Sequence, residues 1–406
     1  MRKLAAIVVV LGLVLGGLSE IPLAKESWAK APEELASAYG KFGFKLFGNL
    51  VGRKQDQNVF VSPASVAFAL AMTYNGAAGA TEQAMARTLE IQGLKLDELN
   101  RDNARLRQAL SQPDPQIKLN IANSLWLRQG HSFKPDFLKR NEEFYQAAVK
   151  VLNFADPQAP ATINDWVKKE TEGKITRIVG QLQPGTILFL INATYFKGKW
   201  TRPFDPARTR ERPFTLLGGQ VKKLPMMSQS GFYKYYRGKN FQAVSLPYGK
   251  NQKWSMKIFL PDQNSSLKEF LSQLNAADWQ QWLSGFQGTP GSIVLPRFKL
   301  EYEASLKAPL TALGMGAAFD EAKADFSRLC PSPPTVYIDD VMHKTFLEVN
   351  EEGNEAAAAT AVKVAATGRP APRPGFTMVV DRPFFLAIDD SETGVQLFLG
   401  AVVEPR

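Results

Sequence analysis

Cysteine and histidine are nearly absent from this 406-residue chain, which holds one cysteine, Cys330, and two histidines, His131 and His343. A single cysteine excludes an internal disulfide, so packing must stabilise the fold. Two isolated histidines are too few for a histidine-rich metal site. The sequence also lacks a GxSxG elbow, an HExxH pair and a phosphate-binding glycine loop. We therefore expect no enzyme of these classes, no metal and no cofactor.

Acidic residues are outnumbered by basic ones, and the formal net charge is +10. Because the excess is spread along the chain, a solvated surface is the main interpretation and an anionic partner is the minority one. The candidate surface for a polyanion is the basic face of an expected helix over 96–110, which carries Arg101, Arg105 and Arg107. No feature indicates nucleic acid, and we expect a monomer.

Long hydrophobic runs are missing except at the N-terminus, where Arg2 and Lys3 precede an apolar run from Leu4 to Leu18. This run is shorter than the roughly 20 residues that a membrane span needs. Basic, apolar and then small polar residues are typical of a secretory signal peptide. We expect the signal peptide to cover 1–24 and the mature protein to be secreted or periplasmic. A permanent anchor is the alternative.

Apolar spacing predicts helices early in the chain and antiparallel strands late in it, which indicates one α+β domain over 32–406. No break in composition marks a second domain. Three of the expected helices cover 32–51, 96–110 and 163–171. Two more begin at Pro63, after a capping Ser62, and at Thr81. The expected strands cover 59–61, 119–127, 187–196, 232–247, 253–260, 292–300, 384–388 and 396–402.

The segment 351–374, EEGNEAAAATAVKVAATGRPAPRP, is unusual because its local preferences conflict. Alanine favours helix, whereas Thr360, Val362 and Val364 favour a strand. Prolines at three alternate positions from Pro370 remove backbone donors, so this end cannot pair as a central strand. The pattern indicates an exposed loop that could become a strand, and a low-complexity linker is the alternative.

Taken together, motifs from residue 32 to the C-terminus resemble the serpin family in family order. The matching segments are NVFVSPASVAFALAM from Asn58, INDWVKKETEGKI from Ile163, LINATYFKGKW from Leu190, LPMM from Leu224, IFLPD from Ile258, LPRFKLEYEASL from Leu295, MHKTFLEVNEEGNEAAAAT from Met342, and PFFLAI and FLGAVVEP near the end. The resemblance implies a serpin fold, with helices packed on three β-sheets, a large central sheet and an exposed reactive-centre loop at about 351–380. It further implies an inhibitory, secreted member of prokaryotic type.

For function, the resemblance implies a suicide inhibitor of serine proteases. The protease attacks the loop as a substrate, the loop inserts into the central sheet as a new strand, and the acylated enzyme is carried along and distorted. The implied hinge contains Glu351, Glu352, Gly353, Asn354, Glu355, Ala356, Ala357, Ala358, Ala359 and Thr360. Its four successive alanines favour insertion, whereas Asn354, in place of the usual Thr or Ser, is expected to slow it. A non-inhibitory serpin that acts as a binding protein or chaperone is the alternative.

Family spacing from Gly353 places the reactive bond between Thr367 and Gly368. The family spacing counted back from the C-terminal side of the loop instead gives a bond near Pro372. Ala365, Ala366 and Arg369 are further alternatives. A trypsin-like target is disfavoured because Arg369 and Arg373 each precede a proline. The small side chains before Gly368 favour an elastase-like or subtilisin-like protease.

The resemblance also implies two groups of residues that control opening of the central sheet. Ser62, Ser65, Asn192 and His343 match a polar cluster beneath the centre of the sheet. Trp200, Arg297 and Glu351 match the top of the sheet, where insertion begins, and we expect an ion pair between Arg297 and Glu351. Ordinary core or surface packing is the alternative for each.

Overall fold

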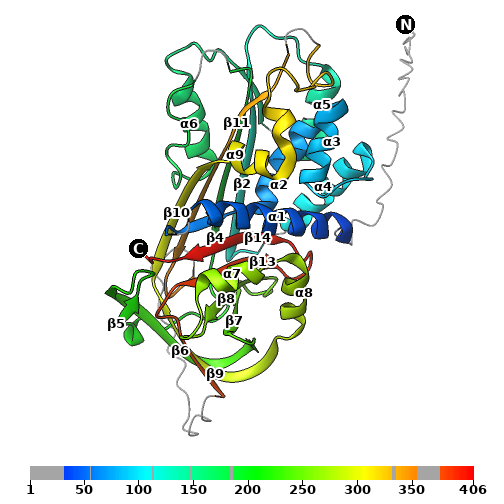
Figure 1. Cartoon of the computed structure of the whole chain (residues 1–406). Helices are drawn as coiled ribbons and strands as arrows, with labels where there is room; N and C mark the ends of the chain where they lie inside the picture. Colours follow the sequence, from blue (N-terminus) through cyan, green and yellow to red (C-terminus); the bar gives the residue numbers. More distant parts are fainter. Residues whose placement is uncertain are drawn as a thin grey trace, which may run out of the picture. The chain divides into compact units, whose positions relative to one another are not determined.

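The computed structural model describes residues 32–54, 56–111, 114–146, 148–182, 186–331, 335–353 and 375–406. Residues Ala31–Arg406 form one compact unit (Figure 1). The expected signal segment 1–24 lies outside the described residues. No helix in the described part of the chain is long and apolar enough to cross a membrane.

A five-stranded sheet has the strand order β10–β11–β4–β2–β3, and it lies in the upper and middle part of the view in Figure 1. Its strands are β2 (Ile117–Arg128), β3 (Ala148–Leu152), β4 (Leu188–Gly198), β10 (Phe298–Ser305) and β11 (Ile338–Val349). Two neighbouring pairs are parallel, β11 with β4 and β2 with β3, and the other two are antiparallel. All residues of β4 except one are buried, as its continuous apolar run predicts.

The other strands form a nine-stranded sheet, in the order β1–β14–β13–β8–β7–β6–β9–β12, with β5 paired to β6. Hydrogen bonding therefore joins the described strands into two sheets where the resemblance implies three. The reason is the 17-residue β6, which pairs with β5 over Val221–Met226, with β9 over Met226–Tyr235 and with β7 over Lys234–Arg237. The strands are β1 (Val59–Val61), β5 (Arg210–Thr215), β6 (Val221–Arg237), β7 (Phe241–Tyr248), β8 (Trp254–Pro261), β9 (Gln287–Pro296), β12 (Phe376–Val379), β13 (Phe384–Asp390) and β14 (Gln396–Val402).

Helices cover both faces of the five-stranded sheet. Ile163 and Val167 of α6 pack against Trp126 and Phe346 on one face, and α2, which is buried at every residue, lies against β2 and β4. The helices are α1 (Glu33–Arg53), α2 (Pro63–Tyr74), α3 (Gly79–Thr88), α4 (Leu96–Leu110), α5 (Pro135–Tyr145), α6 (Ala159–Glu170), α7 (Leu267–Gln273), α8 (Ala276–Ser284) and α9 (Lys307–Leu310). Short turns of other helix types cover Pro206–Arg208, Thr311–Met315 and Gly316–Phe319.

Three expected elements differ from the structure. The strand expected over 292–300 is two strands in different sheets, because β9 ends at Pro296 and β10 begins at Phe298. The strand expected over 232–247 is likewise divided into β6 and β7, which pair as a hairpin. Thr81 lies within α3, which begins at Gly79 with a positive φ of 52°.

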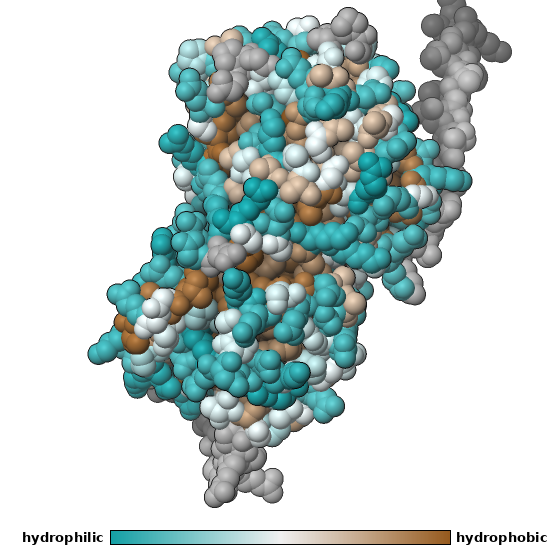
Figure 2. Space-filling view, viewed as in Figure 1, coloured by the Kyte–Doolittle hydropathy of each residue, from teal (hydrophilic) through white to brown (hydrophobic). Residues whose placement is uncertain are grey.

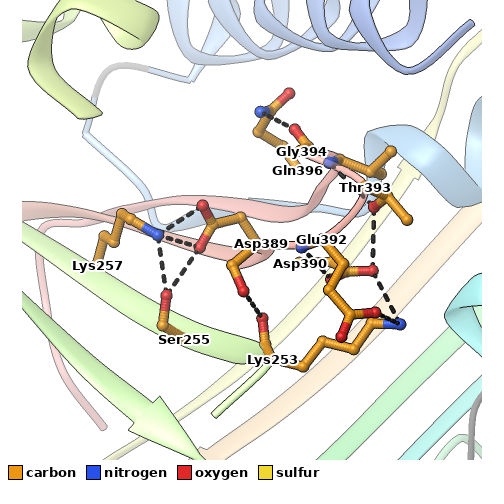
Figure 3. A network of polar contacts seen from close by, with 11 residues as sticks. Lys253, Ser255, Lys257, Asp389, Asp390, Glu392, Thr393, Gly394 and Gln396 are labelled. Atoms are coloured by element: carbon orange, nitrogen blue, oxygen red, sulfur yellow. Dashed lines mark hydrogen bonds and ion pairs between the residues drawn. The ribbon is translucent and has the colours of Figure 1, made fainter. Parts of the chain in front are cut away.

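A buried polar network joins β8, β13 and the turn before β14 (Figure 3). Lys257 Nζ lies 2.5 Å from Asp389 Oδ2, and both side chains are buried. Lys253 Nζ lies 2.9 Å from Glu392 Oε2 and 3.5 Å from Asp390 Oδ2. Since buried charges are costly unless they are paired, these contacts let two lysines lie within the fold.

Candidate functional site

The boundary between β11 and β4 is the central feature of the five-stranded sheet, and we call it the seam. The two parallel strands are in register from Asp340 beside Phe189 to Phe346 beside Tyr195, and a register shift separates this run from the pair of Ile338 and Leu188. Their outer neighbours, β10 and β2, are antiparallel to them. A strand entering the seam in the direction opposite to both would therefore have antiparallel neighbours on each side.

Side-chain hydrogen bonds cross the seam beneath the sheet. His343 on β11 lies in register with Asn192 on β4, and its Nδ1 bonds to the Asn192 side-chain oxygen. The Asn192 amide also donates to Ser65 Oγ on α2 and to the Asn123 side-chain oxygen on β2. We call His343, Asn192, Ser65 and Asn123 the polar cluster. The cluster ties β11 and β4 to each other and to α2.

The protonation state of His343 follows from its contacts. The backbone N–H of Ser62 donates to His343 Nε2 at 3.2 Å, so this nitrogen is an acceptor and the proton lies on Nδ1. Burial lowers the pKa of His343 from 6.5 to about 3. His343 is therefore neutral at physiological pH, in the tautomer that bonds to both Ser62 and Asn192.

Ser62 is the N-cap residue of α2, as expected, and it contributes its backbone N–H to the contact with His343. The Ser62 hydroxyl makes no capping bond to α2 and has no hydrogen-bond partner among the described residues. Two threonines absent from the sequence prediction complete the surroundings of the cluster. Thr194 donates to Ser65 Oγ at 2.8 Å, and Thr345 donates to the Phe60 carbonyl at 2.6 Å. Thr194 lies two positions after Asn192, and Thr345 lies two positions after His343. Residues two apart on a strand share a face, so this spacing could have predicted both threonines.

At the end of the seam, Gly353 pairs with both strands. It forms an isolated antiparallel bridge to Lys199, the residue that follows β4. Its carbonyl also accepts a bond of 2.8 Å from the backbone N–H of Asn350, the residue that follows β11. The φ angle of Gly353 is 139°, and an added Cβ would lie 2.1 Å from the Gly198 carbonyl oxygen. Only glycine fits this position.

The expected ion pair between Arg297 and Glu351 is present beside this turn. Arg297 Nη2 lies 2.5 Å from Glu351 Oε1, and Arg297 Nε donates to the same oxygen at 2.7 Å. Thr209, which the sequence prediction missed, also donates to it. Burial raises the pKa of Glu351, but the hydrogen bonds from Arg297 and Thr209 outweigh it and hold the pKa below its ordinary value. Glu351 is therefore a buried, ionised carboxylate.

Trp200 holds the same turn from the β4 side. Its ring stacks on Tyr248, with centroids 4.3 Å apart, and its Nε1 donates to the Asn350 carbonyl at 2.9 Å. Its backbone N–H donates to the Glu352 carbonyl at 2.8 Å. The structure thus brings Trp200, Arg297 and Glu351 together around the turn, and we call them the hinge anchor.

The remaining loop predictions lie outside the described residues and stay predictions. They concern the hinge from Asn354 to Thr360 and the reactive bond Thr367–Gly368 with its alternatives.

The candidate polyanion surface on α4 is partly engaged within the protein. Arg105 lies 3.3 Å from Asp102, and Arg107 donates to the Phe144 carbonyl at 3.1 Å and to Gln146 at 3.0 Å. These contacts leave less of the face for a partner than its sequence suggests. Within the described ranges, no group of three or more His, Cys, Asp or Glu side chains could hold a metal ion.

Comparisons with known proteins identify the family. The family model described as Serpin (serine protease inhibitor) matches residues 37–405. Serpin B8 of Homo sapiens is 37% identical over 382 residues, which are 92% of this chain and 100% of that protein. Leukocyte elastase inhibitor of Homo sapiens is 34% identical over 385 residues, with the same coverage of 92% and 100%. The native-state crystal structure of the thermophilic serpin Tengpin has a TM-score of 0.84 at 33% identity, and the match covers 91% of this chain and 94% of that one. This chain belongs to the serpin family of serine protease inhibitors.

Proposed function

We propose that this serpin is a suicide-type inhibitor of serine proteases. The target protease attacks the loop after Gly353 as a substrate and forms an acyl-enzyme. The loop then enters the seam as a new strand and carries the bound protease with it, and distortion of the protease prevents deacylation. The observation that carries the proposal is the pairing of Gly353 with the ends of both β11 and β4.

The geometry of the seam supports insertion. Gly353 is bonded at the ends of both β11 and β4, so it occupies the position of the first residue of a strand between them. A strand that continued from Gly353 into the seam would run antiparallel to both. The 15 residues of 353–367 would span about 50 Å as a strand. β11 has 12 residues, or about 40 Å. The loop segment is therefore long enough to fill the seam.

Hydrogen bonding supplies a driving force. Insertion breaks a parallel ladder of eight residue pairs and forms two antiparallel ladders of about ten bonds each. The net gain is about a dozen bonds, and at about 1 kcal/mol each this favours insertion by about 10 kcal/mol. The small side chains from Ala356 to Ala359 limit the steric resistance between the strands.

In the proposed mechanism, the polar cluster holds β11 and β4 together before the loop is cleaved. The bond between His343 and Asn192 joins adjacent strands, and a strand placed between them would double their separation of about 4.8 Å. This bond must break before the seam opens, so it raises the barrier to insertion before cleavage.

The target in this proposal is an elastase-like or subtilisin-like protease. Val364, Ala365, Ala366 and Thr367 are small, and such side chains fit a shallow specificity pocket. The similarity to human leukocyte elastase inhibitor is consistent with this choice.

The proposal is tested by incubating the protein with pancreatic elastase, subtilisin and trypsin. Denaturing electrophoresis and the mass of the released C-terminal peptide are the readouts. We expect a covalent complex that resists denaturation, with a peptide that begins at or near Gly368. Cleavage by all three enzymes without any covalent complex, together with an unchanged melting temperature after cleavage, would overturn the proposal.

A non-inhibitory binding protein is the second candidate, and Asn354 is the residue that favours it. The amide of Asn354 needs hydrogen-bond partners when it is buried, which would slow insertion relative to deacylation. Replacing Asn354 with threonine would increase the fraction of covalent complex if this residue limits insertion. An unchanged fraction would show that Asn354 does not control the outcome.

A further inference from the structure

An apolar hollow of about 260 Å³ opens between α1, α7 and the end of β14. It shares no residue with the polar cluster or the hinge anchor. Figure 2 shows hydrophobic surface along the junction of α1 and α7, at mid-height in the view, where hydrophilic surface lies above and below. Its apolar walls include Phe44, Phe47, Val51, Leu267, Leu271 and Val403.

An exposed apolar side chain lies at the edge of this hollow. Leu217, in the turn between β5 and β6, lines the hollow and is 49% exposed. Single exposed apolar residues are ordinary on protein surfaces, whereas a hollow with apolar walls and an apolar edge indicates a binding site.

Two glycines leave the α1 side of the hollow without side chains. Gly48 and Gly52 lie one helical turn apart, both line the hollow, and a Cβ added to either would meet no atom within 4 Å. Glycine within a helix lowers stability relative to alanine. Gly48 and Gly52 therefore lower the stability of α1 at the two positions where a side chain would occupy the hollow. This observation is independent of the apolar walls, and it also indicates space for a ligand.

The rim of the hollow is positively charged. Lys54 and Lys268 line it, and no aspartate or glutamate does. Over the described ranges, neither lysine has a carboxylate at ion-pairing distance, and Lys54 Nζ lies 5.5 Å from the centroid of the Tyr302 ring. An apolar cavity with cationic groups at its rim is complementary to an apolar ligand that ends in an anion.

We propose that this hollow binds a small free carboxylic acid with an acyl chain or aromatic system as its apolar part. The apolar part lies over Gly48 and against Phe47 and Leu271, and the carboxylate bonds to the ammonium group of Lys268. A free acid fits better than a membrane surface, because the site is concave and membrane binding needs a protruding apolar face.

Decanoate titrated into the full-length protein at pH 7.5 in a calorimeter tests this proposal. We expect a dissociation constant between about 1 and 100 μM and a rise in melting temperature on binding. Decylammonium, with the same chain and the opposite charge, is expected to bind at least about tenfold more weakly.

Variants of the hollow locate the site. Gly48→Met places a side chain in the hollow, where its Cβ meets no atom within 4 Å, and it removes a helical glycine. It is expected to keep or raise the melting temperature while weakening decanoate binding at least about thirtyfold. Lys268→Ala is expected to weaken binding about threefold at low salt. Lys41→Ala is the matched control, because Lys41 is exposed on α1 outside the hollow, and it should leave binding unchanged.

Three results would overturn the proposal. They are decanoate binding as tight in the Gly48→Met variant as in the wild type, equal binding of decylammonium, and no heat with decanoate up to about 1 mM. Sedimentation with anionic phospholipid vesicles in the absence of decanoate binding would assign the hollow to a membrane surface instead. None of these measurements contains a protease, so their failure leaves the proposed inhibitory function intact.

Discussion

Replacing His343 with glutamine is expected to reduce the acid sensitivity of the protein. Burial holds the pKa of His343 at about 3 in the folded protein, against 6.5 for the ordinary side chain. Between these two pH values the unfolded chain binds a proton that the folded chain does not. The free energy of unfolding therefore falls as pH drops from about 6.5 toward 3.

The size of this effect follows from the two pKa values. At pH 5 the unfolded histidine is almost fully protonated and the folded one is neutral, which costs about 2 kcal/mol relative to pH 8. The loss approaches about 5 kcal/mol near pH 3. Glutamine cannot titrate, so the variant lacks this loss. It also loses the bond from Ser62 to Nε2, which lowers its stability equally at both pH values.

Urea denaturation at pH 8 and pH 5 is the assay. The loss of unfolding free energy between the two pH values should be smaller in the His343→Gln variant than in the wild type by about 2 kcal/mol. His131 is the matched control, since it is the only other histidine in the chain. His131→Gln should change this loss less than His343→Gln does, because His131 is only partly buried. If His343→Gln lost as much stability as the wild type, the buried neutral state of His343 would be refuted.

Three further substitutions probe the turn and the buried pairs, each measured by urea denaturation. Gly353→Ala should cost about 2 kcal/mol, because the new Cβ would clash with the Gly198 carbonyl at a positive φ, and unchanged stability would contradict the observed turn. Glu351→Gln should cost about 1 kcal/mol at pH 7. Because glutamine cannot be protonated in this range, the variant should lack the part of the loss of unfolding free energy below about pH 4.5 that comes from protonation of Glu351. An identical acid profile in variant and wild type would contradict the lowered pKa. Lys257→Met should cost about 3 kcal/mol or more, because it leaves Asp389 buried without its partner, and adding Asp389→Leu should restore most of the loss.

Sequence periodicity was sufficient for elements whose pattern matches one secondary structure throughout. The helices over 33–53 and 96–110 and the buried strand 188–198 lie within a few residues of their expected positions. Periodicity failed at Arg297, because apolar alternation continues from β9 into β10 although the chain changes sheets there. A change of sheet depends on tertiary pairing, and local preference does not encode it.

The functional site was predictable mainly through the family resemblance. His343 and Asn192 are 151 positions apart, and only the register of β11 with β4 brings them into contact. The ion pair of Arg297 with Glu351 was expected for the same reason and is present. Asn123 and Thr209 were missed, because nothing near them in sequence indicates their distant partners.

The most direct test of the central claim is the melting temperature before and after cleavage of the loop by subtilisin, with intact mass confirming a single cut within 354–374. Insertion worth about 10 kcal/mol predicts a rise of about 13 °C in the melting temperature of the cleaved protein. A melting temperature that stays the same or falls after cleavage would show that the seam does not admit the loop, and would contradict the proposed mechanism.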